Sequence, residues 1–476
     1  MNIVFSKKPK NTDLAIFMLS PKSLKKAVKR SIAPLKKIIE QEKFTGKEDS
    51  ALFLPAGFEK FKRLLIVGVG EKASAETIRR ATGTAIKVAQ QKKIQKVSFF
   101  VFREFAVATV EASVLANYSF QKYKTVKDEQ KQFVKEVEIV GGLTKEEIDS
   151  CRQAQLVCNN ANLCRDLIND NSSTVNPDYF ESFVKKHCKK SSLRVSVLKE
   201  SQLKKLGMKL VLAVGRGSES RPRVIVIEYN GNRSSKEKFL FVGKGITFDT
   251  GGLDIKPGRA METMRDDMSG AAVTFALLKS CAELKLKKNV VGILGLAENL
   301  VDALSYRQGD VYTSMKGLTV ENNSTDAEGR LVLADTIYYG VTKFKPKLVV
   351  DFSTLTGSAM RTFGDHVGFM CSTSDSAAKT FFEAGMHTFE RVWRMPMYDE
   401  YRKEVKGTRS DIRSLNKRPN NGAIFAACFL DHFTEKTPFV HLDIAGTAFI
   451  EEPKPYLESG GTGFGVRLAI EFLKKK

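Results

Sequence analysis

Two short stretches of the sequence concentrate side chains that could hold cations and polarise a substrate. The first runs from residue 242 to 272, and the second runs from residue 322 to 335. Together they supply four acids and three cationic groups: Asp249, Asp267, Asp326, Glu328, Lys244, Lys256 and Arg330. If the fold brings the carboxylates together, they form a cation site.

The second stretch reads N-N-S-T-D-A-E-G-R-L-V-L-A-D, and its spacing is the more restrictive. Asp326, Glu328 and Arg330 alternate with small residues, so in a locally extended backbone all three side chains project to one side. The apolar residues that follow recur at helical spacing, which predicts that a helix begins here and favours carboxylates at its start. The alternative is that these acids only cap the helix and pair with Arg330.

The first stretch favours the cation site. Lys244 lies in an apolar run that is typical of a strand, and Asp249 is followed by the turn residues Gly251 and Gly252. An ammonium group in such a segment is costly unless it meets acids or gives up its proton. A neutral amine is a good metal ligand.

The balance of charge predicts two metal ions. Four carboxylates packed together repel one another unless cations balance them, and two divalent ions do so. Lys256 and Arg330 then make the pocket net positive, which suits an anionic tetrahedral intermediate. Carboxylate oxygens and one amine accept Mn, Zn, Mg or Co, so the chemistry of the residues alone predicts a dinuclear metallohydrolase.

Both stretches resemble the signatures of the leucyl aminopeptidase (cytosol aminopeptidase) family, dinuclear metallopeptidases whose hallmark is N-T-D-A-E-G-R. The similarity runs from about residue 150 to the C-terminus through further motifs: E-Y-N-G (228–231), R-x-G-D-V (307–311), T-L-T-G (354–357), H-L-D-I-A-G-T (441–447) and G-T-G-F-G-V-R-L (461–468). The resemblance implies an aminopeptidase that releases N-terminal residues, leucine-like ones preferred, from peptides.

The resemblance also implies a ligand for each of two divalent metal ions, Mn²⁺ or Zn²⁺. Asp249 and Glu328 are similar to the acids that bridge both metals. Lys244 and Asp267 would complete the tighter site, and Asp326 the more exchangeable one.

Two cationic residues resemble the family's catalytic groups. Lys256 matches the lysine that polarises the scissile carbonyl, and Arg330 matches the arginine that anchors bicarbonate, the expected general base toward the attacking water. The pocket for the first side chain of the substrate would be formed near Met264, Thr354, Gly357 and Ala445. A homohexamer is implied as well, with catalytic domains inside and N-terminal domains outside.

Three residues depart from the family's pattern. Ser324 stands where the Asn of N-T-D is usual, Thr250 where D-S-G-G is commoner, and Ser353 where A-T-L-T-G is. None removes a metal ligand or a catalytic cation, so the departure at Ser324 bears on substrate preference rather than on activity.

Composition bounds the class of protein. With 476 residues and 42% hydrophobic content, the chain is expected to form two domains or more. Its seven cysteines form no C-x-x-C pair, which favours thiols in a reducing cytosol over disulfides or a zinc knuckle. We expect a cytoplasmic protein because the sequence lacks a secretory signal and an apolar stretch near ~18 residues, the length that a membrane span needs.

The excess of positive charge is uneven. The net charge is +23, and residues 1–150 contribute +12 of it, with 29 Lys and Arg against 17 Asp and Glu. A lysine-rich surface is usually a solvated face, but it should attract polyanions weakly and without sequence preference. A second hypothesis is therefore an additional or substitute nucleic-acid-binding or regulatory role through the basic N-terminal domain.

The predicted fold is α/β with two domains: a smaller N-terminal domain (1–145), a connecting helix (146–169) and a larger catalytic domain (170–476) with a central mixed sheet. In the N-terminal part, strands are predicted at 14–19, 63–69, 97–102 and 137–140 and helices at 23–40, 75–91 and 105–119, an order typical of a mostly parallel sheet. V-G-V-G-E-K (67–72) is predicted to be a strand-to-helix turn, because it lacks the G-x-G-x-x-G of nucleotide-binding turns.

The predicted strands of the catalytic domain lie at 193–198, 209–214, 223–229, 238–243, 289–297, 347–352 and 438–444. Glycine turns follow the strands at 238–243 and 347–352, where sites on open α/β sheets gather. Residues 402–421, rich in Lys and Arg, are predicted to be an exposed mobile loop, with an anion site as the alternative.

Overall fold

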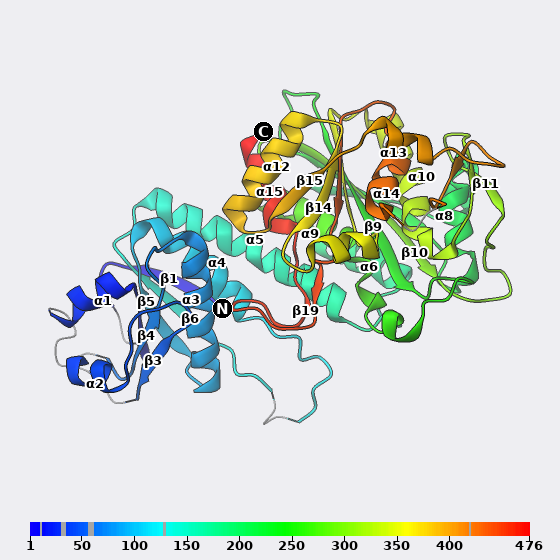
Figure 1. The fold of residues 1–476 in the computed structure, drawn as a ribbon. Coiled ribbons are helices and arrows are strands. Elements are labelled where there is room, and N and C mark those ends of the chain that lie inside the picture. Colours follow the sequence, from blue (N-terminus) through cyan, green and yellow to red (C-terminus); the bar gives the residue numbers. More distant parts are fainter. Residues whose placement is uncertain (10–11, 30–34, 56–60, 127–129, 418–419) are drawn as a thin grey trace. The chain divides into compact units, whose positions relative to one another are not determined.

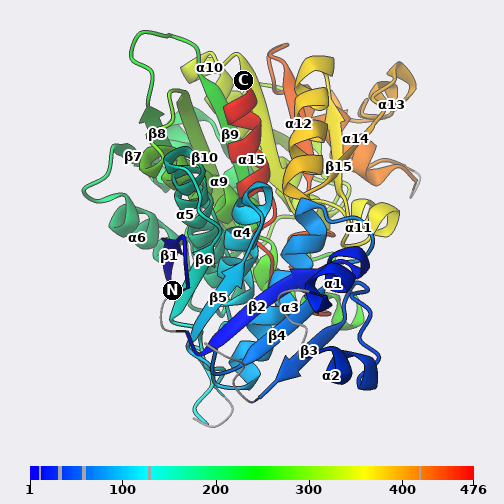
Figure 2. The same ribbon diagram turned by 90° about the vertical axis from the view of Figure 1, so that its left-hand side faces the viewer.

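The computed structural model describes residues 1–9, 12–29, 35–55, 61–126, 130–417 and 420–476, and these residues form two compact α/β units (Figures 1 and 2). The first unit comprises Met1–Asn159 and Glu451–Ser459, and the second comprises Asn160–Ile450 and Gly460–Lys476. The division falls within the long helix α5 (Lys145–Asn169). The predicted two-domain α/β architecture is therefore correct.

The first unit is built on a six-stranded sheet. Its strand order is β1 (Asn2–Ser6), β6 (Glu136–Val140), β5 (Lys96–Phe100), β2 (Leu14–Leu19), β4 (Leu64–Gly68) and β3 (Ala51–Leu54). β3 pairs with β4 antiparallel, and the other neighbours are parallel, as predicted. The two edge strands, β1 and β3, were not predicted.

Helices of the first unit pack on this sheet: α1 (Pro21–Val28), α2 (Lys36–Gln41), α3 (Ala75–Gln91) and α4 (Ala106–Ala116). Leu64 and Ile66 of β4 share a core with Leu24 of α1 and Ile39 of α2. The helix predicted over 23–40 is described as α1 and α2, and residues 30–34 lie outside the described residues. The turn after β4 leads into α3, whose N-cap is Ser74, so the predicted strand-to-helix turn is confirmed.

The second unit contains the predicted mixed sheet, with eight strands. Their order is β15 (Val392–Met395), β14 (Gly368–Ser372), β17 (Phe439–Asp443), β13 (Leu348–Ser353), β9 (Phe239–Asp249), β10 (Asn289–Asn299), β8 (Arg223–Asn230) and β7 (Leu193–Leu198). β17, β13, β9 and β10 run parallel, whereas β14, β8 and β7 introduce antiparallel pairs. The four parallel strands end at the same edge of the sheet.

The second unit contains these helices: α6 (Pro177–Cys188), α7 (Glu200–Leu206), α9 (Ser269–Glu283), α10 (Glu328–Phe344), α11 (Gly357–Phe363), α12 (Asp375–Thr388), α13 (Asp399–Glu404), α14 (Gly422–Asp431) and α15 (Val466–Lys475). Most pack on the sheet, and α13 packs on α14. Both α9 and α10 pack on the central strand β9. Gly243 of β9 lies against Gly270 at the start of α9, whereas the next residue, Lys244, meets the start of α10. The alternation of a strand thus assigns one face of β9 to each helix.

The strand predicted at 209–214 is wrong, because Lys209–Val214 forms the helix α8. A six-residue apolar run does not distinguish a buried strand from a buried helix. A distant residue decides the matter, since the carboxylate of Asp335 accepts hydrogen bonds from the backbone N–H groups of Leu210 (2.9 Å) and Val211 (3.3 Å). These contacts satisfy donors that the first turn of a helix leaves unpaired.

The exposed loop predicted at 402–421 is also wrong in its central part. β16 (Ile412–Arg413) is buried and extends a small sheet of β11 (Val311–Thr313) and β12 (Thr319–Glu321). Arg413 forms an ion pair of 2.9 Å with Glu321, and both side chains are buried. The polar composition predicted exposure because the partner that neutralises Arg413, Glu321, is distant in the sequence. Residues 418–419 of this segment lie outside the described residues.

Two expectations concern side chains and surface. The seven cysteines are free thiols, as predicted, and all seven are buried. Among the described residues, none of the helices combines the length and the apolar character needed to span a bilayer.

Candidate metal centre

The candidate site lies where three parallel strands end. Asp249 is the last residue of β9 and Asn299 the last of β10, and the two are paired in the sheet register. Ser353 ends β13 on the other side of β9, and Thr354 follows it. Neighbouring parallel strands therefore deliver these polar residues to one edge, as is usual for sites on open α/β sheets.

Lys244 enters the same site from the middle of β9. Its ammonium Nζ lies 2.7 Å from Oδ1 of Asp267 and 2.9 Å from Oε1 of Glu328, and it donates to the carbonyl oxygen of Thr354 at 2.8 Å. A Cβ at Gly329 would lie within 2.5 to 2.8 Å of the Lys244 side chain, so only glycine lets the helix approach this lysine. The Lys244 amine therefore lies within reach of two of the predicted acids.

The predicted extended backbone at residues 326–330 is wrong. Thr325–Ala327 form a 3₁₀ turn, and α10 begins at Glu328. Asp326, Glu328 and Arg330 therefore lie at the start of a helix. The prediction that a helix begins in this stretch is thus confirmed. Thr325 holds the turn in place, because its hydroxyl donates to the carbonyl of Gly251 at 2.6 Å.

Three of the predicted acids converge on one point. Asp249, Asp326 and Glu328 each offer a carboxylate oxygen, and these oxygens lie within 4.8 Å of one another. The ammonium Nζ of Lys256 reaches into this group, at 2.8 Å from Asp249 and 2.6 Å from Asp326. With Asp267 on the far side of Lys244, the structure brings all four acids and both lysines into one cluster.

Burial dominates the electrostatics of the cluster. Burial and the neighbouring Glu328 carboxylate raise the pKa of Asp249 to about 6, against the opposing effect of Lys256 and Lys244. Burial also raises the pKa of Asp267 well above its usual range. For Glu328, burial acts in the same direction, but the two lysines outweigh it and hold the pKa below its ordinary value. The carboxylates need nearby positive charge to stay ionised together.

The donor set fits a divalent cation. Oδ2 of Asp267 and Oε2 of Glu328 are buried and have no hydrogen-bond partner among the described residues. A buried carboxylate oxygen without a partner is costly, and metal coordination is one of the few ways to satisfy it. Together with the converging oxygens of Asp249 and Asp326, these atoms make an oxygen-rich site of the kind that Mn²⁺, Mg²⁺ or Zn²⁺ accepts.

Arg330 lies beside the acids and is itself buried. Its Nη1 donates to the carbonyl oxygen of Ser414 at 2.9 Å, and the guanidinium lies 6.0 Å from the centre of the Phe425 ring. Its Nε has no hydrogen-bond partner among the described residues. Burial lowers the pKa of Arg330 to about 10, although nearby carboxylates oppose this. An arginine held this way offers a donor to an anion.

The residues expected around the substrate are placed by a residue that the sequence analysis did not single out, Asp443 at the end of β17. Its carboxylate accepts from the hydroxyl of Thr356 at 2.7 Å and from the backbone N–H groups of Leu355 and Ala445, each at 3.1 Å. These bonds tie the loop that contains Thr354 and Gly357 to the loop that contains Ala445.

Two of the expected substrate residues lie differently in relation to the acids. Thr354 also contacts the cluster, because its hydroxyl donates to Oδ1 of Asp267 at 2.8 Å. Met264 begins the 3₁₀ turn Met264–Asp266 that precedes Asp267. Its backbone carbonyl oxygen accepts a hydrogen bond of 3.4 Å from the N–H of Asp267.

Asn299 is the second residue that the sequence analysis missed. Its side-chain amide donates to Oδ1 of Asp249 at 2.8 Å and to the carbonyl oxygen of Thr325 at 2.9 Å, so it links the two stretches directly. A signal was available, because Asn299 lies two residues beyond the predicted strand 289–297, at the edge where the other site residues gather.

Ser324 has a clear structural role. Its hydroxyl donates to Oδ2 of Asp254 at 2.5 Å and accepts from the backbone N–H of Asp326 at 3.1 Å. A serine therefore caps the 3₁₀ turn that presents Asp326.

Comparison with family models gives two matches. Residues 162–470 match the catalytic domain of the cytosol aminopeptidase family, and residues 4–127 match the N-terminal domain of the same family. The probable cytosol aminopeptidase of Protochlamydia amoebophila is 37% identical over 91% of this chain and 89% of its own length. That of Aquifex aeolicus is 36% identical over 98% and 96%.

Solved structures of similar proteins agree with these matches. A mutant of tomato leucine aminopeptidase has a TM-score of 0.90 at 27% identity, covering 100% of this chain and 97% of its own. The bottromycin maturation enzyme BotP in complex with Mn has a TM-score of 0.87 at 29% identity, covering 98% and 99%. The Mn in that complex and the acidic cluster described above both support a divalent metal as cofactor.

Proposed function

The chain belongs to the cytosol aminopeptidase family of peptidases, and from that premise we propose that it is a metal-dependent aminopeptidase that releases leucine-like residues from the N-termini of peptides. The observation that carries the proposal is the convergence of the Asp249, Asp326 and Glu328 carboxylates within 4.8 Å. Lys244 and Asp267 adjoin this group, and the unpartnered oxygens of Asp267 and Glu328 support coordination of cations.

In this proposal, the five residues Lys244, Asp249, Asp267, Asp326 and Glu328 hold two divalent ions, Mn²⁺ or Zn²⁺. Such a pair of ions lowers the pKa of the attacking water and stabilises the negative charge that develops on the scissile carbonyl. Burial of the ligands keeps bulk water away from the charges, which strengthens their interactions.

Lys256 is proposed to donate a hydrogen bond to the carbonyl oxygen of the scissile peptide. Its ammonium lies between Asp249 and Asp326, next to the proposed metal ligands, where a substrate carbonyl would approach. The surrounding carboxylates outweigh burial and raise the pKa of Lys256, so the group stays protonated and able to donate.

Arg330 is proposed to anchor a bicarbonate ion that accepts the proton of the water. The unpartnered Nε of this buried guanidinium supports an anion at that position. In Arg330→Ala, added bicarbonate should raise the rate of peptide hydrolysis less than in the wild type. An equal response of both proteins would refute the anchoring role.

Around the substrate, Met264, Thr354, Gly357 and Ala445 are proposed to form the pocket for the first side chain. Asp443 supports this arrangement because it fixes the loops on either side of the pocket. A cytosolic homohexamer completes the proposal, and light scattering on the active protein that gave the mass of a monomer would contradict the hexamer.

The most informative test is hydrolysis of leucyl-p-nitroanilide by metal-stripped protein, with and without added Mn²⁺ or Zn²⁺. We expect little activity without metal and recovery on addition of one of these ions. N-acetyl-leucyl-p-nitroanilide, which lacks a free amine, serves as the matched substrate and should not be cleaved. Full activity of the stripped protein, or equal cleavage of both substrates, would contradict the proposal.

A further inference from the structure

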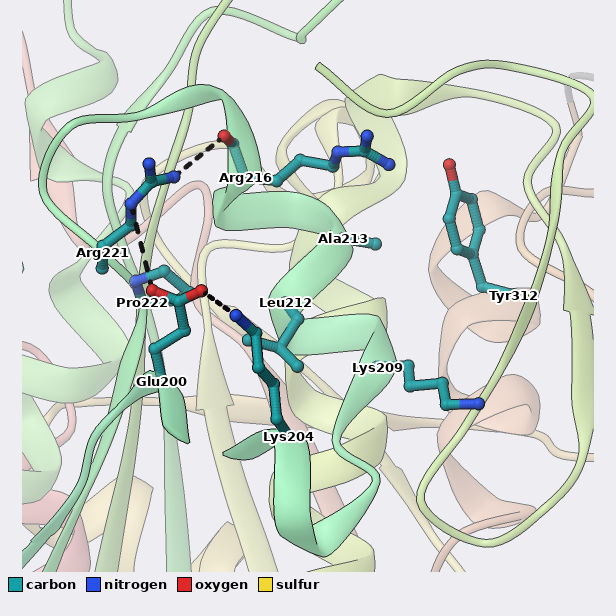
Figure 3. Close-up of a pocket in the computed structure, with 9 residues that line it drawn as sticks. All are labelled: Glu200, Lys204, Lys209, Leu212, Ala213, Arg216, Arg221, Pro222 and Tyr312. Carbon is teal, nitrogen blue, oxygen red and sulfur yellow. Dashed lines mark hydrogen bonds and ion pairs between the residues drawn. The ribbon is translucent and has the colours of Figure 1, made fainter. Parts of the chain in front are cut away.

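A cavity of about 300 Å³ lies in the second unit, apart from the metal centre (Figure 3). It is lined by residues of α7, α8, the 3₁₀ turn Gly215–Gly217, the segment before β8, and β11: Glu200, Lys204, Lys209, Leu212, Ala213, Arg216, Arg221, Pro222 and Tyr312. None of the metal-centre or substrate-pocket residues lines it. Its volume is at the lower end of the range for small-molecule sites.

Three charged residues on one side of the cavity pair with one another, two cations sharing one carboxylate. Lys204 forms an ion pair of 2.6 Å with Glu200, and Nε of Arg221 lies 4.0 Å from the same carboxylate. Arg221 also donates to the carbonyl oxygen of Arg216 at 3.2 Å. This side of the cavity is therefore internally satisfied.

The other side carries two cations that lack such partners. Lys209 begins α8, and Arg216 lies in the 3₁₀ turn that follows this helix. Figure 3 shows both side chains, with Ala213 between them, on the side of the helix turned toward Tyr312. Both side chains are exposed, and within the described part of the chain neither forms a hydrogen bond or an ion pair.

The cavity also has apolar lining residues. Ala213 and the ring of Tyr312 lie on the side of the two cations, whereas Leu212 and Pro222 lie toward Lys204 and Glu200 (Figure 3). An apolar wall beside two unpaired cations matches a ligand with an apolar body and an anionic head, because each part meets a complementary surface.

We propose that this cavity is an accessory binding site for a small organic anion. The apolar or aromatic group of the ligand packs against Ala213 and Tyr312, and its carboxylate or phosphate is bound by Lys209 and Arg216. Peptide hydrolysis at the metal centre does not require such a site. A ligand bound here would therefore act as a regulator of the metal centre and not as a substrate.

The contacts behind the cavity lead toward the metal centre. The ring of Tyr312 packs edge-on against the buried Tyr306, with 6.2 Å between the ring centres. The hydroxyl of Tyr306 donates to the carbonyl oxygen of Thr325 at 2.5 Å, and Thr325 directly precedes Asp326. A ligand that restrains Tyr312 thereby restrains the turn that presents Asp326, so occupancy of the cavity should strengthen metal binding. This second part rests on the proposed metal site, whereas ligand binding itself does not.

Binding is tested with two probes that lack a free α-amine, N-acetyl-leucine and phenyl phosphate, titrated calorimetrically into the metal-loaded protein. The first carries a carboxylate and the second a phosphate, so the pair separates the two possible heads. The double variant Lys209→Ala/Arg216→Ala should bind the preferred probe at least tenfold more weakly than the wild type. The matched control, Lys236→Ala/Lys287→Ala, removes the same charge from exposed positions of the same unit and should bind as the wild type does.

Two outcomes would overturn the binding site. One is that neither probe binds the wild type, and the other is that the Lys209→Ala/Arg216→Ala variant binds with unchanged affinity, since binding would then occur elsewhere.

Coupling is tested by measuring Mn²⁺ affinity against a competing chelator, with and without a saturating amount of the preferred probe. We expect affinity for Mn²⁺ to rise about fivefold or more in the wild type, at the lower end of typical coupling between sites, and to stay unchanged in the Lys209→Ala/Arg216→Ala variant. An unchanged affinity in the wild type would overturn the regulatory part and leave the binding result standing. Absence of Mn²⁺ binding altogether would instead refute the proposed metal site.

Discussion

Both units place glycine turns after parallel strands, yet the two sheets treat buried charge differently. In the first unit, Glu138 lies within β6 and accepts from the hydroxyls of Ser6 (2.7 Å) and Ser98 (2.5 Å), so hydroxyl groups of the same sheet satisfy it. In the second unit, the buried acids gather at the ends of β9 and the start of α10, and oxygens of Asp267 and Glu328 have no partner among the described residues. The hydrogen bonds of Glu138 are made within its own sheet, whereas the free oxygens of Asp267 and Glu328 can bind a ligand.

The two parts of the chain also differ in the density of positive charge. Residues 1–150 have a net charge of +12, and the longer remainder has +11, the difference from the total of +23. Positive charge is therefore denser in the N-terminal part, whereas in the second unit buried acids are set against Lys244 and Lys256. Two sheets with similar strand arrangements therefore differ in the ligands they can bind because different residue types stand at their strand ends.

The largest effect is expected when one acid is removed from each unit. Glu328→Ala should lose bound metal and peptidase activity together, with a loss of activity of about 10³-fold or more, because it deletes a carboxylate that the cations need. Glu138→Ala, the matched change in the first unit, should lower the unfolding temperature but retain metal and activity while folded. Metal content and leucyl-p-nitroanilide hydrolysis measure both. Two bound metals and full activity in Glu328→Ala would refute the dinuclear site.

A smaller loss is expected from Lys256→Ala. It should keep its metals but reduce kcat by about 10²- to 10³-fold, as removal of one oxyanion donor does. Lys316→Ala removes a lysine of the same unit that pairs with Glu435 and should leave kcat unchanged. Steady-state kinetics with metal analysis decide the matter; a rise in KM at constant kcat would assign Lys256 to substrate binding alone.

Asn299→Ala should weaken metal binding by about 10- to 100-fold, because residues that orient metal ligands usually contribute that much. Asn289→Ala is the matched control at the opposite end of β10, where the asparagine side chain bonds to backbone carbonyls of Asn232 and Ser235. Chelator competition measures both affinities. Equal affinities in the two variants would show that Asn299 has only a structural role.

A dependence of stability on pH is expected from Asp335, whose pKa burial raises to about 7 against the lowering effect of backbone hydrogen bonds. The folded protein retains this proton after the unfolded chain has lost it, so the contribution of Asp335 to stability falls as pH rises from about 4 to about 7, by on the order of 4 kcal/mol. Asp335→Asn should make this slope smaller by the part that Asp335 contributes, while Asp249 and Asp267, whose pKa values burial also raises, maintain the remainder. The exposed control Asp302→Asn should keep the full slope. Urea unfolding of metal-free protein across this range measures the slope, and identical slopes in the wild type and Asp335→Asn would exclude the effect.

The smallest effect is expected from the basic first unit. We expect weak binding of duplex DNA without sequence preference, falling steeply with salt because each neutralised phosphate releases about 0.9 counterion. Fluorescence anisotropy at increasing salt concentrations measures it. Binding that persisted at physiological salt and preferred one sequence would instead indicate a dedicated nucleic-acid role.

Most of the elements that position the site could be predicted from the sequence, because strands with strong apolar patterns are stabilised by burial wherever they lie. The parallel strands β9, β10 and β13 were found in this way, and the glycine turns marked the edge where the site forms. The wrong predictions concern segments whose structure depends on residues distant in the sequence. Lys209–Val214 is a helix whose N-terminal N–H groups bond to the carboxylate of Asp335, and Arg413 is buried in an ion pair with Glu321.

The sequence by itself identified the residues proposed to form the site, because acids, lysines and glycines at fixed spacing are local features. Only the tertiary structure decided how they meet. Lys244 and Glu328 lie on different elements, and their 2.9 Å contact exists because β9 and α10 pack together at Gly329. Asn299 and Asp443 gained their roles in the same way, since hydrogen bonds between strand ends depend on strand order, which local sequence does not encode.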